Sequence, residues 1–212
     1  MLEVQKLTKQ FDRVAAVQNA GFVLRDDASA AILGQSGSGK STLLRLLAGL
    51  LSPDAGTIRK DGQELPTAPH LRGMAMTFQE PALWNHMTVK ENILFGCSVK
   101  PKTAREAFLQ GLAEDFGIED LMGRKPWEIS GGQAKRVALA RAIACRRQVL
   151  LLDEPFSNLD AEIKAQVIDA VRRRCKGKCT LLLVTHDPCE AAALCDVQYR
   201  MESGVLTKED AL

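Results

Sequence analysis

Alternation of apolar and polar residues marks the first part of the chain. The segment LEVQKL (residues 2–7) alternates, and the apolar GFVL (21–24) follows QNAG (18–21), whose composition is typical of a turn. Period-two alternation places every second side chain on the same face of a strand. We therefore expect antiparallel strands within residues 2–24, joined through a turn at QNAG.

Continuous apolar runs then alternate with segments of helical pattern. Runs of this kind are typical of strands buried on both faces, in a parallel sheet covered by helices. The punctuation of SPDAGTIRKDGQEL (52–65) favours a hairpin, and residues 88–128 have a polar, helical pattern. The sequence therefore predicts an α/β fold. The other expected elements are strands at 28–34, 71–79, 149–155 and 180–187, a helix after the glycine-rich loop at 34–41, and helices at 134–148 and 161–175.

The composition is that of an ordinary globular protein. Of the 212 residues, 46% are apolar and 25% are charged, which suffices for one domain with a buried core. The net charge of +2, with both signs interspersed, argues against a basic nucleic-acid groove or a polybasic membrane anchor. The longest apolar stretches, such as LLRLLAGLL, are shorter than the roughly 20 residues of a bilayer span. We expect a single domain that does not itself cross a membrane.

Cysteine usage adds one alternative to weigh. None of the six cysteines forms a CxxC pair, so we expect reduced thiols. Four of them lie between positions 175 and 195, where a zinc site is conceivable. Their spacings differ from the close pairs of typical zinc sites, which favours small, buried or half-buried side chains instead.

GQSGSGKS (34–41) lies between an apolar strand and a helix, which is the setting of a phosphate-binding loop. Its glycines allow the backbone to curl so that successive N–H groups surround a β-phosphate. Lys40 is expected to bridge the β- and γ-phosphates, and Ser41 to place its hydroxyl on Mg²⁺. The motif predicts a nucleoside triphosphate with Mg²⁺ as the ligand.

Polar side chains lie at the ends of three other expected strands. Asp153 is placed to hold the metal, and Glu154 to orient and polarise an attacking water. A single acid at a strand end often caps the next helix, but capping does not explain two adjacent acids. Because the carboxyl ends of parallel strands meet at one edge, His186 is expected at the γ-phosphate. Gln79 is a further candidate for contact with metal and water.

A second glycine-rich motif, ISGGQ (129–133), begins the helix expected at 134–148. It contains no carboxylate, thiol, imidazole or cation, and so no obvious catalyst. Unpaired N–H groups at a helix start, glycines that permit close approach, and the helix dipole are nevertheless suited to an anion. The chain therefore has two predicted phosphate-binding elements, far apart in the sequence.

Together these motifs resemble the ATP-binding subunit of an ATP-binding-cassette transporter. The resemblance covers nearly the whole chain in the expected order, and Ser-Gly-Gly-Gln ahead of the acidic strand is its most specific feature. Ile129 stands where Leu is commoner. Phe11 stands where a tyrosine usually stacks on adenine, which either ring can do, and core packing is the alternative for it. GQSGSGKS resembles the Walker A motif, FQ (78–79) the Q-loop, ISGGQ the signature, VLLLDE (149–154) Walker B, SNLD (157–160) the D-loop and TH (185–186) the switch histidine.

The resemblance implies that two copies pair head-to-tail, with each ATP between the Walker A motif of one copy and the signature of the other. It also implies a P-loop NTPase core with an antiparallel β subdomain at about 1–79 and 129–212, and a helical subdomain at about 80–128. The implied catalytic residues are Glu154, His186 and Gln79, and the implied Mg²⁺ ligands are Ser41, Gln79 and Asp153. The implied nucleotide-binding residues are Phe11, Gly34, Gln35, Ser36, Gly37, Ser38, Gly39, Lys40, Ser41, Thr42, Ser130, Gly131, Gly132, Gln133 and Asp160.

The resemblance further implies partners in the membrane. Integral membrane permease subunits would be separate proteins, and the cassette would lie peripherally on the cytoplasmic face of the membrane. EPALWNHMTVKENI (80–93) resembles importer subunits for small polar or charged solutes, so an extracytoplasmic solute-binding protein is an implied indirect partner. Trp84, His86 and Met87 are candidates for contact with the permease, local packing being the alternative.

The resemblance implies an ATP hydrolase that powers a membrane importer, and two other functions stay open on the sequence. A soluble cassette ATPase acting on DNA or ribosomes would ordinarily carry long coiled coils or a second cassette, and the low net charge attracts phosphate backbones weakly. We therefore expect no nucleic-acid partner. An ATP-dependent regulator of a membrane complex without transport is not distinguished by the residues alone. The sequence does not predict the transported solute.

Overall fold

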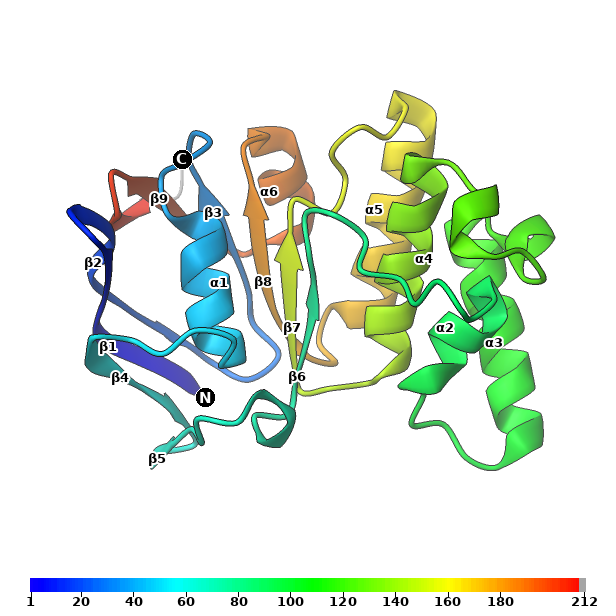
Figure 1. Cartoon of the computed structure of the whole chain (residues 1–212), viewed down its shortest axis with the longest axis horizontal. Helices are drawn as coiled ribbons and strands as arrows, with labels where there is room; N and C mark the ends of the chain where they lie inside the picture. Colours follow the sequence, from blue (N-terminus) through cyan, green and yellow to red (C-terminus); the bar gives the residue numbers. More distant parts are fainter. Residues whose placement is uncertain (210–212) are drawn as a thin grey trace.

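The computed structural model describes residues 1–209, which form one ten-stranded sheet with helices on both faces (Figure 1). The strand order is β5-β4-β1-β2-β10-β9-β3-β8-β7-β6. The strands are β1 (Leu2–Phe11), β2 (Val14–Leu24), β3 (Ser29–Leu33), β4 (Ala55–Lys60), β5 (Gln63–Glu64), β6 (Met74–Thr77), β7 (Val149–Asp153), β8 (Thr180–Thr185), β9 (Val197–Glu202) and β10 (Val205–Glu209). The helices are α1 (Lys40–Ala48), α2 (Val89–Phe95), α3 (Lys102–Phe116), α4 (Gly131–Ala144), α5 (Ala161–Cys175) and α6 (Pro188–Leu194), with 3₁₀ helices η1 (Pro69–Leu71), η2 (Glu119–Leu121) and η3 (Pro126–Glu128).

The sheet has an antiparallel half and a parallel half. β5, β4, β1 and β2 pair antiparallel, whereas β9, β3, β8, β7 and β6 pair parallel. β10 joins the halves, because it pairs in parallel with β2 and antiparallel with β9. This arrangement confirms the predicted mixed α/β fold with antiparallel N-terminal strands. The carboxyl ends of β3, β7 and β8 lie at one edge, as the pairs Leu33–Thr185 and Asp153–Val184 show.

The central parallel strands are buried because helices cover both faces. Successive side chains of a strand point to opposite faces: Val149 and Leu151 pack in a cluster with α1, and Leu150 and Leu152 in a cluster with α4 and α5. Every residue of β3, β7 and β8 is buried. The continuous apolar runs in their sequences predicted this burial on both faces, and the structure confirms it.

The segment from α2 to η3 packs beside α4 and α5, at the end of the molecule away from β1 and β2 (Figure 1). A capping box begins α2: the Thr88 hydroxyl accepts from the Glu91 N–H at 3.2 Å, and the Glu91 carboxylate accepts from the Thr88 N–H at 2.7 Å. The buried Asn92 side chain accepts from the Trp84 N–H at 2.9 Å and donates to the Trp84 carbonyl oxygen at 3.1 Å. These bonds hold the preceding loop against α2.

Three parts of the chain differ from the prediction. QNAG (18–21) forms no turn but lies inside β2, where shifts of register and φ of +47° at Asn19 mark a β-bulge. After Thr185, α6, β9 and β10 extend the fold, although no element was predicted there. Cys189 is exposed rather than buried or half-buried, because it lies on the outer side of the first turn of α6.

The described residues also bear on membranes and metals. None of the helices within residues 1–209 is both long and apolar enough to cross a bilayer. In the same residues, His, Cys, Asp and Glu side chains do not gather in threes at any point where they could bind a metal.

Candidate functional site

The phosphate-binding loop lies between β3 and the start of α1. Two positions of this loop require glycine because a side chain would not fit. A Cβ on Gly34 would lie 2.3 Å from the Met201 carbonyl oxygen, and a Cβ on Gly39, where φ is +106°, would lie 2.0 Å from the Ala16 carbonyl oxygen. Lys40 is only 5% exposed, and its Nζ donates to the carbonyl oxygens of Gly34 and Gln35, both at 2.7 Å. The loop therefore wraps around the Lys40 ammonium group.

The electrostatics of Lys40 tie the loop to the acidic strand end. Burial lowers the pKa of Lys40, whereas Glu154 and Asp153 raise it. A buried ammonium next to carboxylates attracts further negative charge only weakly unless a cation accompanies that charge. This arrangement suits a phosphate that arrives together with a metal ion.

A cavity of about 590 Å³ opens over this loop. Its lining brings together Gln79, which follows β6, and Glu154, which follows β7. The sequence analysis placed both residues in one site, and the fold explains this because the two strands are neighbours with the same direction. The rest of the lining is the phosphate loop from Ser36 to Ser41, Thr42, Arg13, Val14, Ala15, Ala16, Gln18, Ser203 and Gly204.

Ser41 and Asp153 form a suitable site for a divalent cation. Ser41 Oγ donates to Asp153 Oδ1 at 2.9 Å, although the residues are far apart in the sequence. Asp153 is 1% exposed, and its second carboxylate oxygen, Oδ2, is buried without a hydrogen-bond partner. Burial raises the pKa of Asp153, an effect that the Ser41 hydrogen bond and Arg45 oppose. An unpartnered buried oxygen beside a hydroxyl fits a hard cation such as Mg²⁺, whose ligands are oxygens.

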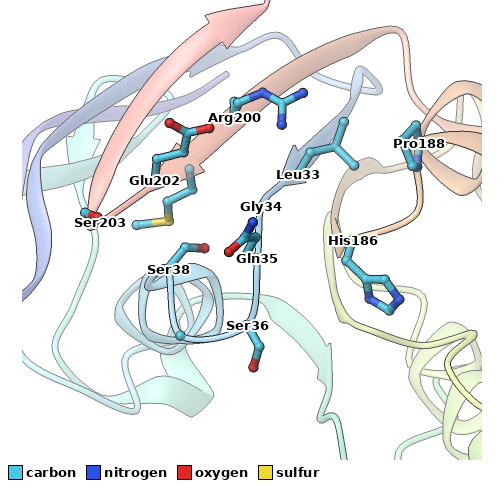
Figure 2. A pocket seen from close by; sticks show the side chains of 12 residues that line it. Leu33, Gly34, Gln35, Ser36, Ser38, His186, Pro188, Arg200, Glu202 and Ser203 are labelled. Carbon is cyan, nitrogen blue, oxygen red and sulfur yellow. The ribbon is translucent and has the colours of Figure 1, made fainter.

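Glu154 and His186 meet at the same edge. The Glu154 carboxylate lies 3.6 Å from His186 Nδ1. Glu154 has φ of +43°, and its N–H donates to the Val184 carbonyl oxygen at 2.9 Å, so β8 fixes the residue in a left-handed conformation. His186 is exposed and lines a second cavity of about 560 Å³. Figure 2 shows this cavity with the phosphate loop on one side, β9 carrying Arg200 and Glu202 on another, and His186 on a third.

The signature motif forms the start of α4. Ser130 is the N-cap: its Oγ accepts from the Gln133 N–H at 3.2 Å, and the Gln133 side chain accepts from the Ser130 N–H at 2.8 Å. Gly131 is exposed. In the described part of the chain, neither the 590 Å³ cavity nor the 560 Å³ cavity is lined by residues 130–133. Figure 1 shows the starts of α1 and α4 at the same edge of the molecule, with β8 and β7 between them.

Phe11 and Asp160, which the sequence analysis predicted to bind the nucleotide, lie outside the 590 Å³ cavity. Phe11 is 44% exposed at the end of β1, where its ring lies 5.6 Å from Lys9 Nζ. The cavity wall nearest to it in the sequence begins at Arg13. Asp160 is the exposed N-cap residue of α5 and makes no side-chain capping bond. The predicted roles of Phe11 and Asp160 stay predictions.

Sequence reasoning missed the contribution of the C-terminal hairpin. Ser203 and Gly204, in the turn between β9 and β10, line the main cavity, and Met201 packs against Gly34 and Gly39. The signal was present, because VQYRMESGVL alternates and contains a Ser-Gly turn. The hydrogen bond from Lys135 to Ser157, which connects α4 to the loop after Glu154, was not predicted either, although Ser157 lies in the SNLD motif.

Comparison with protein families matches residues 17–157 to the family described as "ABC transporter". The matched span contains the phosphate loop, the signature and the acidic strand end. The chain belongs to the ABC transporter family.

Curated relatives of this ABC chain carry the names of import proteins. It is 41% identical over 197 residues to "Sulfate/thiosulfate import ATP-binding protein CysA" of Mycobacterium tuberculosis, covering 91% of this chain and 56% of that protein. It is 40% identical over 210 residues to "Xylose/arabinose import ATP-binding protein XacJ" of Haloferax volcanii, covering 97% of this chain and 55% of that one. The chain thus spans about half the length of these relatives.

Solved structures share the fold. The ABC transporter cassette MJ0796, described as bacterial and dimeric, superposes with a TM-score of 0.86 at 24% identity, with full coverage of both chains. A dimeric post-hydrolysis state of the same cassette, bound to ADP and Pi, gives a TM-score of 0.85 at 24% identity, again with full coverage of both chains.

Proposed function

We propose that this chain is the ATP-hydrolysing subunit of an ABC importer, and that it drives separate membrane subunits through ATP-dependent closure of a head-to-tail dimer. The observation that carries the proposal is the convergence of Lys40, Ser41 and Glu154 on one cavity, with the buried Asp153 bonded to Ser41 and the Ser130 signature outside that cavity. Each copy then holds a nearly complete site and lacks only a lid. The lid is the signature of a second copy.

Within this site each residue has a distinct task. The loop N–H groups and Lys40 would hold the β- and γ-phosphates. Ser41, Asp153 and Gln79 would hold Mg²⁺, which neutralises charge on the phosphates. Glu154 would orient and polarise the attacking water, and His186 would contact the γ-phosphate.

Adenine recognition belongs to the same proposal. The base would extend from the loop along the wall at Arg13–Ala16, toward the exposed ring of Phe11. The base would then cover apolar surface of that ring.

Closure by a second copy would bring backbone N–H groups to the γ-phosphate. Ser130, Gly131 and Gly132 present the start of α4, with its dipole, at the same edge of the sheet as the phosphate loop (Figure 1). Gln133 supports Ser130 through the capping box, and the exposed Asp160 would communicate across the dimer. ATP would therefore hold the dimer together, and hydrolysis would release it.

A groove beside the site suits a membrane partner. A cavity of about 400 Å³ between β6 and α4 is lined by Met74, Met76, Phe78, Ala82, Trp84 and Arg141, among other residues. Trp84 is 37% exposed, and its ring contacts the Phe95 ring at 4.4 Å and the Arg141 guanidinium at 4.5 Å. An exposed aromatic residue held rigidly at a methionine-rich groove is a favourable anchor for a partner helix. His86 and Met87 follow in the same loop.

The names of the relatives, which are import ATP-binding proteins, support the choice of an importer. The chain would then lie on the cytoplasmic face of the membrane and be served indirectly by an extracytoplasmic solute-binding protein. Because those names cover both sulfate and pentoses, they support no particular solute. The solute would be selected by the permease and the binding protein.

Trp84→Ala should detach the cassette from its membrane partner. We expect at least about a tenfold lower recovery of a polytopic membrane protein with the tagged chain from its native membranes, because Trp is a typical hot-spot residue. ATP hydrolysis by the isolated chain should stay within about twofold of wild type, since Trp84 lies outside the nucleotide cavity. The matched control is Leu71→Ala, which removes a 63% exposed apolar side chain elsewhere. Recovery of ribosomes or DNA in place of a polytopic protein would contradict the proposal.

Asp153→Asn should weaken metal binding selectively. The change keeps the side-chain shape but removes the charge, so we expect the Mg²⁺ concentration for half-maximal ATP hydrolysis to rise at least about tenfold. Metal-free binding of a fluorescent ATP analogue should stay within about twofold. Asp169→Asn, which alters a half-buried carboxylate on α5 paired with Arg172, is the control. An unchanged Mg²⁺ requirement would remove Asp153 from the metal site.

A further inference from the structure

Lys135 and Ser157 connect two elements that serve different half-sites in the proposed dimer. Lys135 lies in α4, which begins with the signature, and Ser157 lies in the loop that runs from Glu154 to α5. Lys135 Nζ donates to the Ser157 carbonyl oxygen at 3.0 Å and also to Ser157 Oγ. Ser157 Oγ in turn donates to the Glu154 carbonyl oxygen at 2.9 Å. A continuous chain of hydrogen bonds thus runs from α4 to the backbone of Glu154.

The loop touches α4 at a second point. A Cβ on Gly132 would lie 3.4 Å from Leu159 Cδ2 and 3.7 Å from the Asn158 carbonyl oxygen. Gly132 and Lys135 are three residues apart, so they lie on one face of the helix. The loop therefore packs along the first turns of α4, directly behind the residues proposed to receive the partner's γ-phosphate.

The backbone of this loop needs external support. Glu154 has φ of +43° and Asn158 has φ of +61°, both in the left-handed region that costs energy for residues other than glycine. Such conformations persist where surrounding contacts enforce them. The Val184 carbonyl oxygen fixes Glu154 from the side of the sheet, and Lys135 fixes the next turn of the loop from the side of α4.

The surroundings of Lys135 favour a charged hydrogen-bond donor and differ from those of a lysine on the solvated surface. Its side chain is half-buried, burial lowers its pKa, and the carboxylates of Glu154 and Glu190 raise it. Glu190 is itself engaged by Lys164 at 2.8 Å. A charged donor holds a carbonyl oxygen more strongly than a neutral one does, so the ammonium group suits the task of fixing a strained loop.

We propose that Lys135 is a positioning residue that makes Glu154 move together with the signature of its own protomer. This inference rests on the proposed function. When the signature receives the triphosphate held by the partner, α4 shifts, and Lys135 carries the shift through Ser157 to the backbone of Glu154. The water-orienting carboxylate of one site is thereby set by occupancy of the other site.

The test is steady-state ATP hydrolysis by Lys135→Met and Lys135→Arg, with Lys208→Met as a control for loss of an exposed lysine in β10. Methionine keeps the length but cannot donate, so we expect kcat to fall about tenfold and KM for ATP to stay within about twofold, because positioning is lost and binding is not. Any cooperativity in ATP concentration should fall toward a Hill coefficient of about 1. Arginine keeps a charged donor and should restore at least about half of the lost kcat.

Two results would overturn the inference. One is a kcat and a Hill coefficient in Lys135→Met that match those of Lys208→Met. The other is equal loss in the Met and Arg variants together with a lower Tm in both, since this pattern would mean a merely structural side chain. The proposed function is checked separately through ATP-dependent dimerisation of Glu154→Gln with lysine 135 intact. A dimer there supports the proposed function whatever the kinetics at position 135, and absence of the dimer would remove both proposals.

Discussion

Glu154→Gln is expected to reduce steady-state ATP hydrolysis about 1,000-fold while Mg-ATP binding stays within about twofold of wild type. The amide is nearly isosteric, so it keeps the shape of the side chain but cannot accept the proton of an attacking water. The substituted position keeps its N–H donation to Val184, because that bond belongs to the backbone. Phosphate release measures turnover, and equilibrium dialysis with labelled ATP measures binding.

The same variant should accumulate a dimer when Mg-ATP is added. If ATP holds two copies together and hydrolysis separates them, blocking hydrolysis leaves the closed state populated. Light scattering during size-exclusion chromatography distinguishes monomer from dimer, with ADP in place of ATP as the control. Normal turnover by Glu154→Gln would contradict the role given to this carboxylate, and a monomer with bound ATP would contradict closure.

Lys40→Ala is expected to weaken ATP binding at least about 100-fold, because it removes the charge at the centre of the phosphate loop. Lys40 is 5% exposed and donates to two loop carbonyl oxygens, so its loss affects both the charge and the shape of the cradle. The variant should therefore fail at binding itself, unlike Glu154→Gln. Fluorescence anisotropy of a labelled ATP analogue measures the affinity directly.

A loss of ATP affinity in Lys40→Ala is informative only if the variant is folded. Lys40→Ala should retain the far-ultraviolet circular dichroism of the wild type, because the α1 side chains of the core, such as Leu43 and Leu47, are unchanged. Lys208→Ala is the matched control for loss of an exposed lysine. A folded Lys40→Ala protein with unaltered affinity for ATP would show that the loop does not hold the triphosphate.

Local motifs made much of the fold and part of the site predictable. The phosphate loop is contiguous, and its strand–loop–helix setting can be recognised in the sequence alone. Asp153 ends β7, and Ser41 lies at the start of α1, just after the loop that follows β3. The two residues meet because β3 and β7 run in the same direction and end at one edge, which is a general property of such sheets. Gln79, which follows the parallel strand β6, lines the cavity for the same reason.

Long-range packing explains what could not be predicted. QNAG has turn residues, yet pairing of β2 with β1 on one side holds it as a bulge within a continuous strand. The contact between Lys135 and Ser157 depends on how α4 packs against the loop after β7, which no local pattern specifies. Phe11 and Ser130 lie outside the cavity, and their predicted contacts, with a base and with a second copy, stay predictions.

In the proposed dimer, one triphosphate is shared between the phosphate loop of one copy and the signature of another. The most direct measurement is a crystal structure of Glu154→Gln with Mg-ATP. We expect a two-fold dimer in which Ser130 Oγ and the N–H groups of Gly131 and Gly132 lie within about 3.5 Å of the γ-phosphate held by Lys40 of the other copy. A γ-phosphate enclosed by a single chain, with Ser130 remote from any nucleotide, would contradict it.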